Sequence, residues 1–164
     1  DRKGKGLLLG KDLGINLTLA SISKFVRGLQ IDRNKERVAL DDAIKEFDIR
    51  TGRKDILAGQ LSGGNQQKLL LAKMMLLNPS IVIIDEPTRG IDVGTKEQIY
   101  QFIANLADEG KSIIVVSSEM PELIGICDRI VVMREGCIAG EVTGERMTEH
   151  DIVVLATGVS TEAA

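Results

Sequence analysis

The stretch Leu61–Lys68, LSGGNQQK, decides how this chain of 164 residues is interpreted. Ser62 is a preferred helix N-cap, and Gly63 and Gly64 leave the first backbone N–H groups of the following helix bare of side chains. Such N–H groups, together with the positive end of the helix dipole, form a site for a phosphate group. A capped helix on a glycine turn has the same local sequence, so this stretch alone leaves both interpretations open.

A second run, IVIIDEPTRGID at Ile81–Asp92, favours the phosphate site. It begins as a continuous apolar strand and then presents two adjacent carboxylates, Asp85 and Glu86, of which the first lies 17 residues after Lys68. Ligands of open α/β sheets bind at the carboxyl ends of the strands. P-loop nucleotidases use an aspartate at this place to hold Mg²⁺, and a neighbouring glutamate can orient or deprotonate the attacking water.

Together the two runs resemble the ATP-binding subunits of ABC transporters. LSGGNQQK is similar to the signature motif of that family, IVIIDE to its Walker B strand, and Thr88–Asp92 to its D-loop. More narrowly, the run DEPTRGIDVGTK, the SSEMPE of Ser117–Glu122 and the opening DRK resemble the second, C-terminal nucleotide-binding half of the sugar-importing subunits. The resemblance covers nearly the whole chain and implies ATP and Mg²⁺ as cofactors.

The resemblance also implies roles for individual residues. Asp85 would bind Mg²⁺ through water, Glu86 would be the general base, and Asp92 would couple the two halves of a dimer. Contacts with the ATP held by the opposite half would come from the signature residues Ser62, Gly63, Gly64, Asn65 and Gln66. Ser118 stands where the family usually has a phosphate-contacting histidine, which places it in the catalytic group; we favour the alternative that Ser118 is only the N-cap of a helix starting at Glu119.

The opening Asp1–Lys11, DRKGKGLLLGK, imitates a P-loop without being one. The motif G-x-x-x-x-G-K-[ST] requires a glycine where Lys5 stands, and Ser or Thr where Asp12 follows Lys11. These 164 residues therefore contain no Walker A motif. We expect a fragment of an ATPase subunit that does not turn over ATP on its own.

The apolar periodicity predicts an α/β fold: a partial P-loop NTPase (ABC ATPase) domain with a parallel sheet core, a helical subdomain and a C-terminal β-hairpin. The predicted helices are Leu13–Phe25, Val38–Phe47 closed by Gly52, Gln66–Leu77, Lys96–Glu109 capped by Thr95, Glu119–Ile126 and Thr148–Ala156. The predicted strands are Ile81–Ile84, Ser112–Ser117, and the hairpin Arg129–Met133 and Cys137–Val142 around a three-residue turn. A charged, solvated loop is expected at Arg27–Arg37.

We divide the chain into three parts. Residues 1–78 form a helical subdomain with the signature helix, residues 79–157 the C-terminal part of a RecA-like ATPase core, and residues 158–164 a frayed tail. No run reaches 18 apolar residues, and the charged start contains no signal-peptide h-region, which predicts a chain that is soluble in its own right.

Composition argues against several other functions. The net charge of −3 and an aromatic content of 2% leave little surface for a nucleic acid. Cys127, Cys137 and the single histidine, His150, lack the spacing of a zinc site or of a histidine-activated nucleophile.

The partners that the resemblance implies are an N-terminal ATPase half, in the same or a second subunit, transmembrane permease subunits and, indirectly, a periplasmic or extracellular sugar-binding protein. They would place the assembled subunit at the cytoplasmic face of the inner membrane. One alternative is an SMC or DNA-repair ATPase half, which needs heptads before the signature; residues 1–60 show none. Another is a non-catalytic module that keeps the signature only to dock on a partner ATPase.

Overall fold

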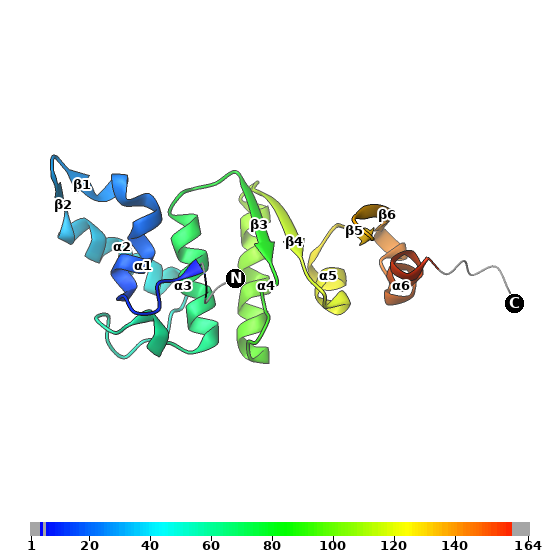
Figure 1. Cartoon of the computed structure of the whole chain (residues 1–164), viewed down its shortest axis with the longest axis horizontal. Coiled ribbons are helices and arrows are strands. Elements are labelled where there is room, and N and C mark those ends of the chain that lie inside the picture. The colour runs from blue at the N-terminus through cyan, green and yellow to red at the C-terminus, as the bar shows by residue number, and fades with distance from the viewer. Residues whose placement is uncertain (1–3, 5, 159–164) are drawn as a thin grey trace, which may run out of the picture.

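The computed structural model describes residue 4 and residues 6–158 and arranges them as a row of helices and strands along one axis (Figure 1). Helices α1 to α3 lie at one end, the strand pair β3 and β4 with helix α4 in the middle, and the hairpin β5–β6 with helix α6 at the other end. Part of the P-loop-like opening and most of the predicted frayed tail lie outside the described residues.

The N-terminal part contains more breaks than the periodicity predicts. The predicted helix Leu13–Phe25 is α-helical only as α1, Leu13–Thr18, and continues as the 3-10 segment Leu19–Phe25 with non-helical backbone angles at Ser21. The expected charged loop is instead a short hairpin, β1 (Val26–Arg27) and β2 (Gln30–Ile31).

Helix α2, Arg33–Glu46, starts earlier than predicted because Asp32 caps it by accepting bonds from Asn34 N and Lys35 N. It also ends earlier, since Asp48 takes a positive φ of 46°. Gly52 is therefore not the residue that closes the helix.

Helix α3, Gly63–Met75, is the signature helix, and it packs against α1 through fully buried leucines such as Leu13, Leu17 and Leu69. A short 3-10 turn, Ala58–Gln60, leads into it. The same hydrophobic cluster continues into the middle of the molecule through Val82 and Ile103. The three-part division of the chain stays a prediction.

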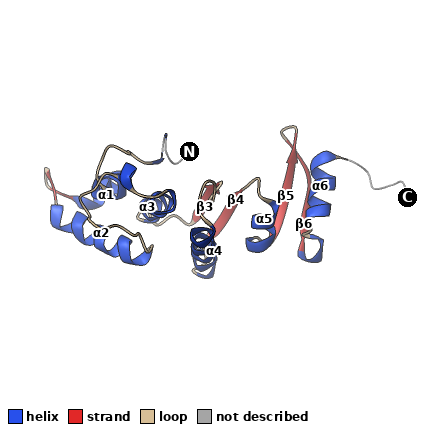
Figure 2. Cartoon of the chain, turned by 90° about the horizontal axis from the view of Figure 1, so that it is seen from below, coloured by secondary structure: helices blue, strands red, loops and turns tan. Residues whose placement is uncertain are grey.

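The predicted strand–helix–strand unit is confirmed. Strand β3, Ile81–Asp85, pairs in parallel with β4, Ser112–Val116, and α4, Val93–Asp108, connects them. Figure 2 shows α4 on one side of the strand pair, where Val82 and Ile84 are buried with Ile99. The cap of α4 is Asp92 rather than Thr95, because Asp92 accepts the bond from Thr95 N.

The C-terminal part has a hydrophobic cluster of its own. Helix α5 (Met120–Ile126) precedes the hairpin of β5 (Arg129–Arg134) and β6 (Cys137–Thr143); a 3-10 turn, Gly144–Arg146, and helix α6 (Glu149–Thr157) follow. Buried residues in this cluster are Ile130, Val132, Val142 and Ile152. The hairpin turn has two residues, not three, because Arg134 pairs with Cys137; Glu135 and Gly136 both have positive φ, as in a type I′ turn.

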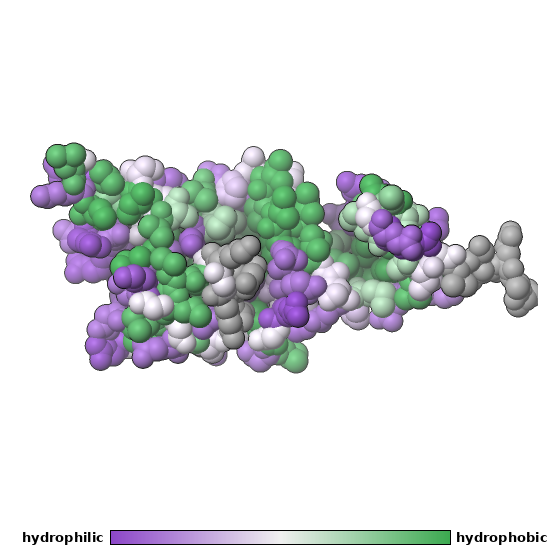
Figure 3. Space-filling model, viewed as in Figure 1, coloured by the Kyte–Doolittle hydropathy of each residue, from purple (hydrophilic) through white to green (hydrophobic). Residues whose placement is uncertain are grey.

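One face of the β3–β4 pair is exposed apolar surface. Ile81 and Ile83 of β3 and Ile114 and Val116 of β4 point away from α4, each at least half exposed. Figure 3 shows the corresponding hydrophobic patch in the middle of the molecule. Among the described residues, no helix has the length and apolar character needed to cross a bilayer.

This exposed face predicts self-association of the purified chain, because contiguous apolar surface and an unpaired strand edge favour contact with another copy. The weight-average mass from sedimentation velocity should rise with concentration. Threonine at Ile83 and Ile114 keeps a β-forming residue while removing apolar area, so the double variant should associate less. Ile138→Thr, on the exposed surface of β6, is the control. A parent chain that stays monomeric at every concentration would contradict the prediction.

Candidate functional site

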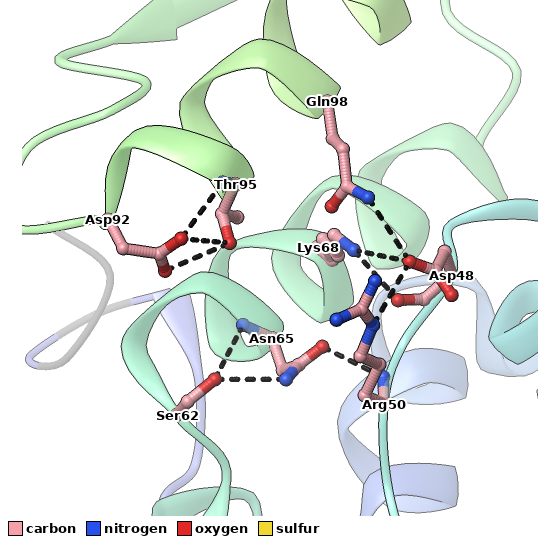
Figure 4. A network of polar contacts seen from close by, with 8 residues as sticks. All are labelled: Asp48, Arg50, Ser62, Asn65, Lys68, Asp92, Thr95 and Gln98. Atoms are coloured by element: carbon pink, nitrogen blue, oxygen red, sulfur yellow. Dashed lines mark hydrogen bonds and ion pairs between the residues drawn. The ribbon is translucent and has the colours of Figure 1, made fainter.

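The start of α3 is a capped and exposed helix N-terminus. Ser62 has extended backbone angles, and its Oγ accepts bonds from Asn65 N at 3.4 Å and Asn65 Nδ2 at 2.9 Å (Figure 4). Arg50 N in turn donates to Asn65 Oδ1 at 2.8 Å. Gly63 is the first residue of the helix and is half-buried. The cap predicted from LSGGN is therefore present.

Gly64 is buried against the neighbouring helix α4. A Cβ atom added at Gly64 would lie 2.6 Å from Thr95 Cγ2 and 2.9 Å from Thr95 Oγ1, closer than side chains can approach. The glycine is thus required for the contact between the first turns of α3 and α4. Sequence reasoning assigned Gly64 only to the approach of a phosphate and missed Thr95, because nothing in the sequence relates the two positions.

Asp92 lies beside this contact as the N-cap of α4. Its carboxylate accepts bonds from Thr95 N at 3.0 Å and from Thr95 Oγ1 at 2.9 and 3.1 Å. The hydrogen bond from the backbone N–H of Thr95 is the main reason that the pKa of Asp92 lies below its usual value, and the bond from the Thr95 hydroxyl adds to the effect. Figure 4 shows Asp92 and Thr95 next to Ser62 and Asn65, so the structure brings this part of the predicted site together.

A second polar cluster, centred on Asp48, ties the end of α2 to α3 and α4. Lys68 of the signature motif, with a side chain only 7% exposed, donates to Asp48 O at 2.7 Å and lies 3.3 Å from Asp48 Oδ2. Gln98 Nε2 of α4 donates to the same Oδ2 at 3.3 Å. The hydrogen bond from Lys68 lowers the pKa of Asp48. This cluster was not predicted, since its three members lie far apart in the sequence.

Gln66 lies in a different environment from the other signature residues. It is buried, and its Nε2 donates to Leu61 O at 3.0 Å. Its Oε1 is buried without a hydrogen-bond partner in the described part of the chain. The side chain that was assigned to the cofactor thus takes part in the packing of the turn before α3.

The remaining predicted residues gather at the carboxyl ends of β3 and β4. Asp85 is the exposed last residue of β3, and Glu86 follows it with a positive φ of 48°. Glu86 Oε1 accepts a bond from the backbone N–H of Ser118 at 3.1 Å. Ser118 does not cap α5; the N-cap is Glu119, whose N–H donates to Ser117 Oγ. The expectation that Ser118 is that N-cap is wrong.

Glu122 is a buried carboxylate that sequence reasoning missed. Its Oε1 accepts a bond from Thr88 Oγ1 at 2.8 Å, and its Oε2 accepts one from Ser117 Oγ. It therefore joins the loop after Asp85 and Glu86 to the loop that carries Ser118. A buried carboxylate that accepts bonds from two different loops holds them in one arrangement.

The two groups of residues match different parts of a Mg²⁺–nucleotide complex. The first turn of α3 contains no acidic residue and is preceded by an exposed serine cap, which suits a phosphate group. Asp85 supplies one exposed carboxylate, and the described residues hold no cluster of three metal-ligating side chains. Mg²⁺ is usually held by one or two carboxylates together with phosphate oxygens and waters. A single exposed aspartate is therefore enough protein ligand for a Mg²⁺ ion that arrives with a nucleotide.

Comparisons with known proteins identify similar sequences. The family described as "ABC transporter" matches residues 12–89. Ribose import ATP-binding protein RbsA 2 of Escherichia coli O157:H7 is 44% identical over 160 residues, which are 98% of this chain and 32% of that protein. Ribose import ATP-binding protein RbsA of Clostridium perfringens (strain SM101 / Type A) is 44% identical over 161 residues, again 98% of this chain and 32% of the relative.

Solved structures give the same result for the fold. A dimeric post-hydrolysis state of the ATP-binding cassette MJ0796 bound to ADP and Pi has a TM-score of 0.71 at 25% identity, covering 84% of this chain and 58% of that one. A second dimeric structure of MJ0796, described as a bacterial ABC transporter cassette, has a TM-score of 0.69 at 27% identity with the same coverage.

The fold therefore defines a part of a P-loop NTPase cassette. The chain belongs to the ABC transporter ATP-binding family. It spans about a third of the length of the two ribose import relatives described above.

The contact between Gly64 and Thr95 can be tested by a double-mutant cycle. Gly64→Ala should lower the free energy of unfolding by about 1–3 kcal/mol, because its Cβ cannot be accommodated beside Thr95. In a Thr95→Ala background the same change should cost at least about 1 kcal/mol less, since two of the three closest atoms are gone. Urea titration measures both. Gly125→Ala, with nothing within 4 Å of its added Cβ, is the control. Equal costs in the two backgrounds would refute the contact.

The cluster around Asp48 predicts a charge-dependent stability. Asparagine tolerates the positive φ of Asp48, so Asp48→Asn removes the charge and keeps the backbone. Near neutral pH the variant should lose about 1 kcal/mol of stability, because the buried ammonium group of Lys68 loses its charged partner. Asp55→Asn, which breaks an exposed pair with Arg53, should leave the urea midpoint unchanged.

The pH dependence gives a second measurement of the same cluster. The pKa of Asp48 is lowered in the folded state, so its contribution is present above the unfolded value of about 3.9 and is lost as the pH falls through the folded pKa. The difference in stability between the parent and Asp48→Asn should therefore shrink as the pH falls below that value. A difference that stays constant down to the acid transition would contradict the assignment.

Proposed function

We propose that this chain is part of the ATP-binding subunit of an ABC-type sugar importer, in which ATP binding and hydrolysis drive transport. The observation that carries the proposal is the intact, exposed cap of α3 beside Asp92, in a chain 44% identical to ribose import ATP-binding proteins. The sugar-import relatives and the absence of heptads in residues 1–60 do not favour the DNA-repair alternative.

In this proposal the first turn of α3 binds the γ-phosphate of an ATP molecule held by another ATPase half. Ser62 and the backbone N–H groups of the first turn provide hydrogen bonds, and the helix dipole adds a favourable field. The contact of Gly64 with Thr95 holds this turn against the cap of α4, so Asp92 and the signature residues keep a fixed relative position. In this proposal Asp92 would couple the two halves of a dimer.

The residues at the ends of β3 and β4 serve a second nucleotide position. Asp85 would hold Mg²⁺ through water, and Glu86 would act on the attacking water as general base. Bound ATP supplies the transferable phosphoryl group; the chain supplies the carboxylates and their positions. Ser118 meets Glu86 through its backbone N–H at 3.1 Å. A serine is a poorer partner for a phosphate than the histidine usual in the family, so we infer that this second position is the less active one.

Permease subunits and a second ATPase half are the partners that this function requires, with a sugar-binding protein acting indirectly. The subunit would then lie at the cytoplasmic face of the membrane. Ribose is the first sugar to test, because the relatives are named for it.

Two cap substitutions separate charge from helix stability. Asparagine and aspartate are both good N-caps, so Ser62→Asn and Ser62→Asp should leave α3 equally stable. Only Ser62→Asp places a negative charge against a phosphate, and it should lower ribose-stimulated phosphate release by roughly a hundredfold. The assay uses the subunit at the length of its relatives, reconstituted with its permease. The 164-residue chain alone, without a P-loop, is the negative control.

Glu86 belongs to the second nucleotide position, which we infer to be the less active one. Glu86→Gln should therefore reduce ribose-stimulated phosphate release by several-fold at most. If Glu86→Gln is as damaging as Ser62→Asp, the two nucleotide positions are equivalent and the asymmetry is wrong. If Ser62→Asn and Ser62→Asp are equally active, α3 does not contact a phosphate, and the alternative of a non-catalytic docking module becomes the better account.

A further inference from the structure

The hairpin β1–β2 projects from the end of the molecule (Figure 1). Its exposed side chains include three apolar ones. Val26 and Ile31 are directly opposite each other in the antiparallel pair and therefore share one face, on which both remain exposed. Between them Gly28, with a positive φ of 64°, turns the chain so that Leu29 is 103% exposed. Three apolar side chains are thus held in water by a defined backbone.

This exposure is a built feature of the hairpin. The pair of strands is closed by a bond from Asp32 N to Phe25 O at 2.7 Å, and Phe25 itself is buried. The hairpin is therefore anchored at its base, while its tip has no second layer in the described part of the chain. Exposed apolar groups that a rigid backbone presents together are typical of a contact surface.

The charge around the tip is opposite to that of the whole protein. Between Lys24 and Arg37 there are five basic and two acidic residues, a net charge of +3, although the whole chain carries −3. Both acidic residues are engaged internally: Asp32 caps α2, and Glu36 is buried and accepts a bond from Thr18 Oγ1 at 2.8 Å.

The basic side chains are left available to a partner. Arg27, Lys35 and Arg37 are exposed, and no ion pair involves them in the described part of the chain. Figure 3 shows hydrophobic residues at the end of the hairpin with hydrophilic ones beside them. An apolar tip surrounded by cations is complementary to a surface that combines hydrocarbon with negative charge.

We propose that the hairpin tip, formed by Val26, Leu29 and Ile31 with Arg27 beside them, contacts the surface of an anionic phospholipid membrane. Leu29 enters the boundary between headgroups and acyl chains, and the basic residues pair with lipid phosphates. This contact goes beyond the proposed import function, because it requires neither ATP nor a permease. It would orient the end of the molecule that carries α1 and α2 toward the bilayer.

The test is co-sedimentation of the purified chain with vesicles. Vesicles of phosphatidylglycerol mixed with phosphatidylcholine should bind the chain, and vesicles of phosphatidylcholine alone should bind it much more weakly. Added salt should weaken the binding. Each basic residue near an anionic surface contributes roughly a fivefold increase in partitioning, so Arg27→Glu should lower it by more than fivefold. Leu29→Ser should also lower it, without a change in circular dichroism, because Leu29 makes no buried contact.

Matched control variants lie elsewhere on the surface. Ile138→Ser removes an exposed apolar side chain from β6, and Arg146→Glu reverses an exposed charge outside the hairpin; both should bind vesicles as the parent does. The proposal is overturned if the controls lose as much binding as the hairpin variants, if the parent binds neither kind of vesicle, or if the hairpin variants impair binding to a permease while vesicle binding stays unchanged. Phosphate release is not measured in this experiment, so its outcome is independent of the proposed ATPase role.

Discussion

The arrangement of the site depends on how closely the first turns of α3 and α4 approach each other. At Gly64 there is no room for even one additional carbon atom beside Thr95, and Thr95 in turn is held by the carboxylate of Asp92. Because Gly64 is in close contact with Thr95, and Thr95 is held by hydrogen bonds to Asp92, the first turns of α3 and α4 have little freedom to slide past each other. Motifs that lie some thirty residues apart in the sequence therefore behave as one structural unit.

Two further polar contacts extend this unit in opposite directions. Lys68 reaches from α3 to Asp48, which fixes the end of α2, and Glu122 reaches from α5 to Thr88, which fixes the loop after β3. Both involve a charged group removed from water, which is favourable only when hydrogen bonds replace the lost hydration. The first contact thus ties the signature helix to α2, and the second ties the loop after the carboxylates to α5.

Sequence reasoning predicted those features that local patterns determine. The apolar strand before Asp85, the serine cap at Ser62 and the parallel pairing of two strands around a helix all follow from residues close together in the chain. It did not predict the features that depend on contacts between residues far apart in the chain. The end of α2 is set by a positive φ at Asp48, and the partner of Gly64 could not be found without the fold. The error in the predicted length of the β5–β6 turn has a different cause. The sequence Glu135-Gly136 fits a two-residue or a three-residue turn, and only the pairing of Arg134 with Cys137 selects the shorter one.

The separate hydrophobic cluster of the C-terminal hairpin has a consequence for how the molecule opens. Ile130, Val132, Val142 and Ile152 share no member with the larger cluster that surrounds α3, so the amides of β5 and β6 are protected by a different set of contacts from those of α1 and α3. Contiguous units of this kind can unfold and refold while their neighbours stay native. We therefore expect the amides of the C-terminal hairpin and α6 to exchange as a unit separate from those around α3.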